Sequence, residues 1–74
     1  MIILAYYNSE KRLTVNINFD FDRLQYVITR HTAGDVWTER TQDKQKAQAI
    51  ANNFINLTSE QLENRTRAGV SLAR

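Results

Sequence analysis

Hydrophobic and polar residues alternate along the stretch from Leu13 to Ile28, and this period of two predicts a pair of neighbouring β-strands. The apolar positions are Leu13, Val15, Ile17 and Phe19 in the first strand, and Leu24, Tyr26 and Ile28 in the second. The polar segment Asp20 to Arg23 between them has the length of a four-residue hairpin loop. With this loop, the cross-strand pairs are Phe19 with Leu24, Ile17 with Tyr26, and Val15 with Ile28. All three pairs fall on one face, as a half-buried antiparallel hairpin requires.

The chain before Leu13 predicts another strand on the same sheet. Its residues Ile2 to Tyr7 are apolar, and the segment Asn8 to Lys11 has the composition of a loop. This loop pairs Tyr6 with Leu13, Leu4 with Val15, and Ile2 with Ile17. Because two independent hairpins select the same apolar face, the pattern indicates one sheet with one buried side.

A fourth strand, Val36 to Thr41, follows the turn Thr32 to Asp35, in which glycine allows a positive φ. Its register depends on the length of the turn. A loop of two or four residues places Trp37 opposite Arg30 on the buried face, whereas a loop of three residues turns Trp37 outward. We expect Trp37 on the buried face, because tryptophan is mostly buried on average.

From about Asp43 the apolar residues recur at helical spacing, which predicts an amphipathic helix over the buried face of the sheet. Its apolar positions are Ala47, Ile50, Ala51, Phe54 and Ile55. Thr58 and Gln61 have the spacing of a capping box, so a second helix is expected to begin at Ser59, carry Leu62 inward and end near Gly69. The predicted class is α+β: a four-stranded antiparallel β-meander with one amphipathic helix across one face and a short C-terminal helix.

Composition sets limits on the size and class of the protein. The 74 residues indicate one small domain, 1–74, near the lower limit for a single hydrophobic core. The absence of cysteine excludes disulfides and thiolate metal sites. The apolar N-terminal run stops at Asn8, so it is too short to span a membrane, and it lacks the features of a signal peptide. We therefore expect a cytoplasmic protein without a membrane partner.

The residues that carry catalysis are sparse, which favours a non-enzymatic protein without cofactor or metal. His31 is the one histidine, and it lies beside a turn without a nucleophile in a recognisable context. Asp20 and Asp22 form a close carboxylate pair, but the further oxygen ligands of a calcium loop are missing from the pattern. Turn chemistry accounts for both aspartates, because their side chains bond nearby backbone amides.

The second face of the predicted sheet is almost free of charge, which is unusual for a solvated face. In the predicted register it carries Ile3, Ala5, Tyr7, Thr14, Asn16, Asn18, Gln25, Val27, Thr29 and His31. One interpretation is a Thr-rich face exposed to water; the other is an interface, in which charge is depleted and an aromatic residue serves as an anchor. The candidate partner-binding residues are Tyr7, Asn16, Asn18, Gln25, Thr29, Arg30 and His31.

A protein partner, or a second copy of this chain, suits such a face best, because a desolvated contact favours mixed polar and apolar groups. Double-stranded DNA is the alternative, since Asn and Gln read adenine and Arg reads guanine in the major groove. The net charge of +2 is compatible with DNA but does not argue for it. Arg65, Arg67 and Arg74 form a second candidate patch, which either binds an acidic partner or phosphate, or complements the dipole of the last helix.

Two resemblances bear on these alternatives. In the stretch from Tyr26 to Phe54, the order of strands followed by a helix resembles the sheet-type arm-binding domains of phage integrases, which implies DNA binding. The small size, the single domain and the lack of catalytic residues resemble the inhibitors made by phages and mobile elements, including anti-CRISPR proteins. That resemblance implies docking on a larger protein. Our first hypothesis is therefore a protein-binding module that uses the sheet face or the sheet edge at Ile2 to Tyr7, with double-stranded DNA binding as the alternative.

Overall fold

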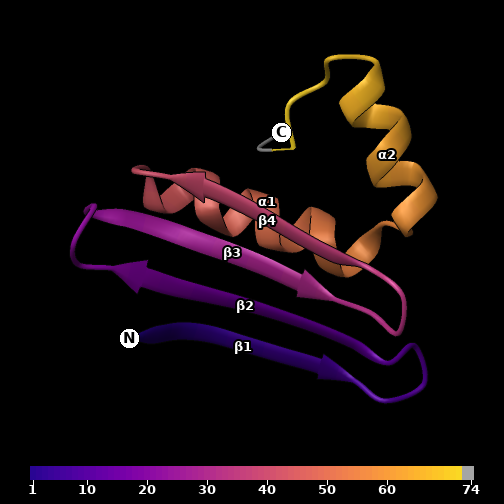
Figure 1. The fold of residues 1–74 in the computed structure, drawn as a ribbon, viewed down its shortest axis with the longest axis horizontal. Helices are drawn as coiled ribbons and strands as arrows, with labels where there is room; N and C mark the ends of the chain where they lie inside the picture. The colour runs from indigo at the N-terminus through magenta and orange to yellow at the C-terminus, as the bar shows by residue number, and fades with distance from the viewer. Residues whose placement is uncertain (73–74) are drawn as a thin grey trace.

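The computed structural model of the protein describes residues 1–72 and has the α+β architecture that the sequence predicts (Figure 1). Four antiparallel strands lie in chain order across one sheet: β1 (Ile2–Asn8), β2 (Leu13–Asp20), β3 (Gln25–His31) and β4 (Val36–Thr41). Two helices follow, α1 (Lys44–Asn56) and α2 (Ser59–Arg67). Neither helix in the described part of the chain is long and apolar enough to cross a membrane.

Helix α1 covers one side of the sheet, which we call the covered face, and packs chiefly against β3 and β2. The Asp43 side chain caps its N-terminus by accepting hydrogen bonds from the amides of Gln45 and Lys46. The core consists of Leu13, Val15, Ile17, Ile28, Ala47, Ile50, Ala51, Phe54, Leu62 and Leu72. The other side of the sheet carries no helix in this structure, and we call it the open face (Figure 1).

Helix α2 begins and ends where the sequence predicts. The Thr58 hydroxyl accepts from the Gln61 amide, and the Gln61 side chain accepts from the Thr58 amide, which completes the capping box. Leu62 is fully buried. After the helix, Gly69 adopts a φ of 73°, and the amide of Val70 donates to the carbonyl of Arg65. This left-handed glycine satisfies carbonyls of the last turn and returns the chain to the core.

The predicted pairing of the first two hairpins is wrong by two residues. The predicted face is right except for Leu24, which lies in the loop, and Ile2, which lies opposite Asn18; both are exposed. Phe19 pairs with Tyr26 rather than Leu24, and Tyr6 pairs with Val15 rather than Leu13. The corresponding loops are Ser9–Arg12 and Phe21–Leu24, each shifted one position later in the chain. A loop shift of one position changes the pairing by two residues, and the pleat has a period of two, so the apolar residues keep their side of the sheet.

The side chain of the last strand residue decides where each of these loops begins. Asn8 Oδ1 accepts from the amide of Lys11 at 3.2 Å. Asp20 Oδ1 accepts from the amides of Asp22 and Arg23 at 3.0 and 3.2 Å. Each Asx side chain thus holds the loop that follows it while its own backbone stays in the sheet.

At the free end of β1 the pairing is irregular. Leu4 lies opposite Ile17, but Ile2 lies opposite Asn18, so a register shift separates Ile2 from Leu4. The predicted pair of Ile2 with Ile17 is therefore absent, and the Ile2 side chain is 64% exposed. At the other edge, Trp37 lies opposite Arg30 on the covered face, after the loop 32–35, which confirms the predicted side for Trp37.

Each of the two shifted loops ends in a residue with a positive φ, 50° at Arg12 and 53° at Leu24. A left-handed backbone at a residue other than glycine, asparagine or aspartate costs roughly 1 kcal/mol or more. Leu24 is 65% exposed, so its side chain contributes little burial in return. We expect Leu24→Asn to raise the free energy of unfolding by about 0.5–1 kcal/mol, measured by denaturant titration.

Phe21→Asn is the matched control, because Phe21 lies in the same loop and is 64% exposed but has no positive φ. The control should bring no gain, since the Phe21 ring contacts Phe19 edge-on at 5.0 Å and that contact would be lost. Equal effects of the two substitutions would mean that the left-handed conformation of Leu24 carries no strain.

Candidate functional site

The open face brings together six of the seven predicted partner-binding residues. Its central row runs across all four strands as Ala5, Asn16, Thr29 and Thr38. On one side lies the row Tyr7, Thr14, His31 and Val36, and on the other lies the row Asn18, Val27 and Arg40. Gln25 lies at the end of β3, opposite Asp20.

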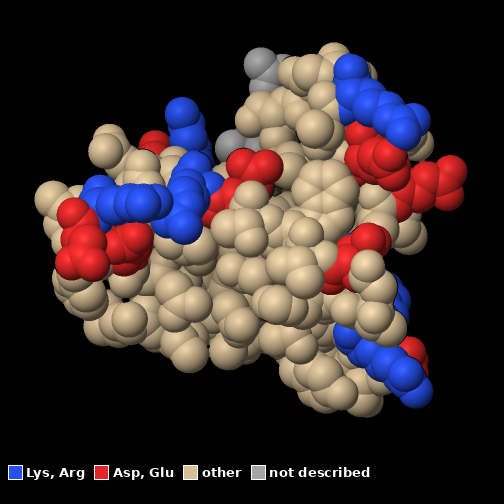
Figure 2. Space-filling model, in the orientation of Figure 1, with Lys and Arg blue, Asp and Glu red and all other residues tan. Residues whose placement is uncertain are grey.

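The surface over the open face is largely uncharged (Figure 2). In this view α1 lies behind the sheet, the Lys, Arg, Asp and Glu side chains gather towards the rim, and uncharged residues cover β1, β2 and β3. At the rim, Arg40 forms an ion pair with Asp20 at 3.5 Å, so its charge is partly compensated. The face therefore presents a broad area with little charge to desolvate.

The polar side chains at the centre of this face have no partners within residues 1–72. Asn16, Asn18 and Thr29 are half-buried, yet none of them makes a side-chain hydrogen bond to another described residue. Amide side chains each offer both donors and acceptors. These groups are consequently available to water or to a bound molecule.

Strand β1 adds exposed apolar surface to one side of the open face. Ile2 and Tyr7 are 64% and 67% exposed, and Ile3 is also exposed. This strand forms one edge of the sheet, and its seven residues contain neither charge nor proline. Charge and proline are two common means of protecting an edge strand from pairing, and β1 has neither; its pairing is irregular only between Ile2 and Leu4.

Arg30 does not belong with the open face, which corrects the predicted grouping. It alternates with Ile28 on the covered face, and only 4% of its surface is exposed. Its Nε–H donates to the Phe54 carbonyl at 3.0 Å, and its terminal nitrogens donate to the Ser59 hydroxyl at 2.9 Å and the Leu57 carbonyl at 3.3 Å. From β3, this side chain therefore holds the junction between α1 and α2.

The environment of Arg30 is unfavourable to its charge. Burial lowers the pKa of Arg30 below its ordinary value, and the negative charge of Asp35 opposes that shift. Neither of the ion pairs within residues 1–72 involves Arg30. The hydrogen bonds that Arg30 donates to neutral groups, together with the charge of Asp35, thus stabilise this buried cation.

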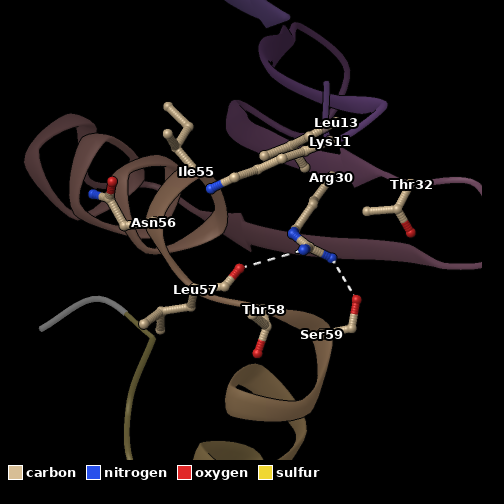
Figure 3. Close-up of a pocket in the computed structure, with 9 residues that line it drawn as sticks. All are labelled: Lys11, Leu13, Arg30, Thr32, Ile55, Asn56, Leu57, Thr58 and Ser59. Atoms are coloured by element: carbon tan, nitrogen blue, oxygen red, sulfur yellow. Dashed lines mark hydrogen bonds between the residues drawn. The ribbon is translucent and has the colours of Figure 1, made fainter. Parts of the chain in front are cut away.

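A pocket of about 370 Å³ opens beside Arg30 at the α1–α2 junction (Figure 3). Its polar lining consists of Lys11, Arg30, Thr32, Asn56, Thr58 and Ser59. Leu13, Ile55 and Leu57 form the apolar part of its wall. The lining holds two cations and no carboxylate, so the pocket has a positive character.

Sequence reasoning missed this pocket, although one of its residues left a signal. Arg30 continues the alternation of Tyr26 and Ile28, and an arginine at a buried position of a strand indicates a guanidinium that must be hydrogen-bonded. Lys11 and Ser59 gave no comparable signal. They lie in a hairpin loop and at the start of α2, and only the packing of α1 on the sheet brings them together.

The second predicted patch is only partly assembled. Arg65 and Arg67 lie in the last turn of α2, where their charges complement the helix dipole. Arg67 also pairs with Glu63 one turn earlier, so it is not a free cation. Arg74 lies outside the described residues.

We expect Arg30→Met to lower the free energy of unfolding by about 2–4 kcal/mol, because the carbonyls of Phe54 and Leu57 would lose their donor in a buried position. Arg40→Met is the matched control: its side chain is 41% exposed and its ion pair is at the surface, so a loss of about 1 kcal/mol or less is expected. Denaturant unfolding of both variants measures the difference. Equal losses would show that the hydrogen bonds of Arg30 do not hold the junction.

Within residues 1–72 no three His, Asp or Glu side chains are grouped so that they could hold a metal ion. His31, the one histidine, is exposed at the end of β3 opposite Val36. Comparison of the chain with protein families, curated proteins and solved structures found no match.

Proposed function

We propose that this chain is a non-enzymatic binding protein that docks on another protein through its open face. The observation that carries the proposal is the uncharged central row of the sheet, where half-buried Asn16 and Thr29 have no described side-chain partner. Interfaces are depleted of charge at their centre and enriched in aromatic residues, and Tyr7 supplies an exposed aromatic at the end of the neighbouring row.

The dimensions of the molecule support docking by this face. Seen down its shortest axis, the chain extends 31 × 29 Å, and the sheet occupies much of that outline (Figure 1). A standard protein interface covers roughly 800 Å² on each partner. A face of this size can thus form a specific contact without a second domain.

The β1 edge extends the same surface. Its exposed Ile2, Ile3 and Tyr7 are contiguous with the open face, and the side of its backbone that faces away from β2 pairs with no strand among residues 1–72. A partner that adds a strand at this edge would gain backbone hydrogen bonds and would cover the apolar side chains at the same time. An inhibitor of a larger protein is one function that such docking would serve.

Double-stranded DNA is the weaker candidate for this face. A DNA-binding sheet needs cations beside its base-reading amides, because phosphate contacts supply most of the affinity. Arg30, the guanine-reading residue of that alternative, is buried on the covered face. On the open face, Arg40 is already paired with Asp20. A protein therefore suits the surface better than a nucleic acid.

Thr29→Arg tests the proposal, because it places an unpaired charge in the middle of the open face without entering the core. Gln48→Arg is the matched control, since Gln48 is exposed on α1. Proteins captured by the immobilised chain would be identified, purified and titrated against each variant. We expect Thr29→Arg to weaken binding by at least about 10-fold, because a charge would be desolvated at the interface, and Gln48→Arg to leave it unchanged.

Light scattering of the chain alone shows whether the partner is a second copy. A dimer that Thr29→Arg dissociates would identify the open face as a self-interface, whereas a monomer leaves the face for another protein. If the Thr29→Arg variant and a Tyr7→Ala/Asn16→Ala double variant both bind the partner as tightly as the unchanged chain, docking by this face is overturned. Binding of duplex DNA at low salt that falls steeply as salt rises would support the DNA alternative in its place.

A further inference from the structure

Not all N–H donors of Arg30, which lines the pocket beside α2, have acceptors among residues 1–72. A guanidinium carries five N–H donors. The Nε–H donates to Phe54, and each terminal nitrogen donates one N–H, to Ser59 and Leu57 respectively. Each terminal nitrogen therefore retains one N–H without an acceptor among residues 1–72. Two such donors on one guanidinium are the arrangement that binds an oxyanion through two oxygens.

A second cation reaches the same pocket from the other hairpin. Figure 3 shows Lys11, from the β1–β2 loop, extending toward Ile55, and the Arg30 guanidinium, from β3, turned toward Leu57 and Ser59; both side chains line the pocket. The hydroxyls of Thr32 and Ser59 also line it, and so do apolar side chains such as Ile55. Because no described residue of the lining carries a carboxylate, an anion placed there would meet no repulsion from these residues.

The start of α2 adds to the positive character of the pocket. Its N-cap, Thr58, uses its side chain for the Gln61 amide, whereas the amides of Ser59 and Glu60 have no described backbone partner. The dipole of the nine-residue helix adds positive potential at this end. The exposed Glu60 side chain does not line the pocket.

We infer that this pocket binds the phosphate group of a small organic molecule, with Arg30 and Lys11 holding the oxyanion. The volume of about 370 Å³ lies at the small end of ordinary ligand sites, so it suits a metabolite rather than a chain segment. The apolar walls formed by Leu13, Ile55 and Leu57 would contact the organic part. This site lies on the helix side of the sheet and is independent of docking by the open face.

Nuclear magnetic resonance of the ¹⁵N-labelled chain tests the inference with phenyl phosphate and inorganic phosphate as probes, at an ionic strength held constant with sodium chloride. We expect both probes to shift the Arg30 Nε–Hε signal and the amides of Leu57 and Ser59. Phenyl phosphate should bind several-fold more tightly, because its ring would contact the apolar walls. Phenol, which lacks the oxyanion, should shift none of these signals.

Lys11→Ala is the decisive variant, because Lys11 is exposed and its loss leaves the core intact. It should weaken phenyl phosphate binding about threefold to fivefold, the size of one partly exposed charge interaction. Lys44→Ala removes the same charge from the exposed start of α1, away from the pocket, and should change nothing.

Equal affinities of phenyl phosphate and inorganic phosphate would assign the pocket to the free anion and overturn the role of its apolar walls. Equal weakening by Lys11→Ala and Lys44→Ala would mean that only the net charge matters, which would overturn the site itself. The site would also be overturned if neither phosphate probe shifted the resonance signals of Arg30, Leu57 and Ser59. None of these results depends on whether the open face binds a protein.

Discussion

Burial of the covered face under α1 is the constraint on which the rest of the structure depends. The largest fully buried side chain, Phe54, comes from α1, and it belongs to the same core cluster as Ile17 of β2 and Ile28 of β3. The four strands and two helices of residues 1–72 leave little further apolar material for a second layer. With one long helix for one sheet, the described chain leaves the other side of the sheet bare (Figure 1). The open face therefore follows from how the core is built.

The α1–α2 junction shows how a polar residue completes this small core. The last carbonyls of a helix have no partners within the helix, and Arg30 donates to those of Phe54 and Leu57 from the neighbouring sheet. The same side chain also donates to Ser59 at the start of α2, so one guanidinium joins the end of α1 to the beginning of α2. The cationic pocket arises at this point because the guanidinium that closes the junction is not paired with a carboxylate.

The two candidate sites require different things of the fold. Docking through the open face requires a broad surface with little charge, which the strands provide through their own residues. A phosphate site requires groups from a loop, a strand and a helix to converge at one point. Such convergence depends on the packing of α1 on the sheet, which brings Ser59 to the pocket that Lys11 also lines.

The sequence by itself determined the side of the sheet for the strand residues apart from Ile2 and Leu24, and it determined where α2 begins. Alternation assigns Val15, Ile17 and Ile28 to the covered face under any register with the same parity, and the Thr58 capping box marks the start of α2 from local spacing. Alternation alone leaves the register open by two residues. The structure resolved it through local hydrogen bonds, because Asn8 and Asp20 cap their loops from within the strands. It also decided the pocket, since no local pattern relates Lys11 to Ser59; their meeting depends on long-range packing, which sequence periodicity does not encode.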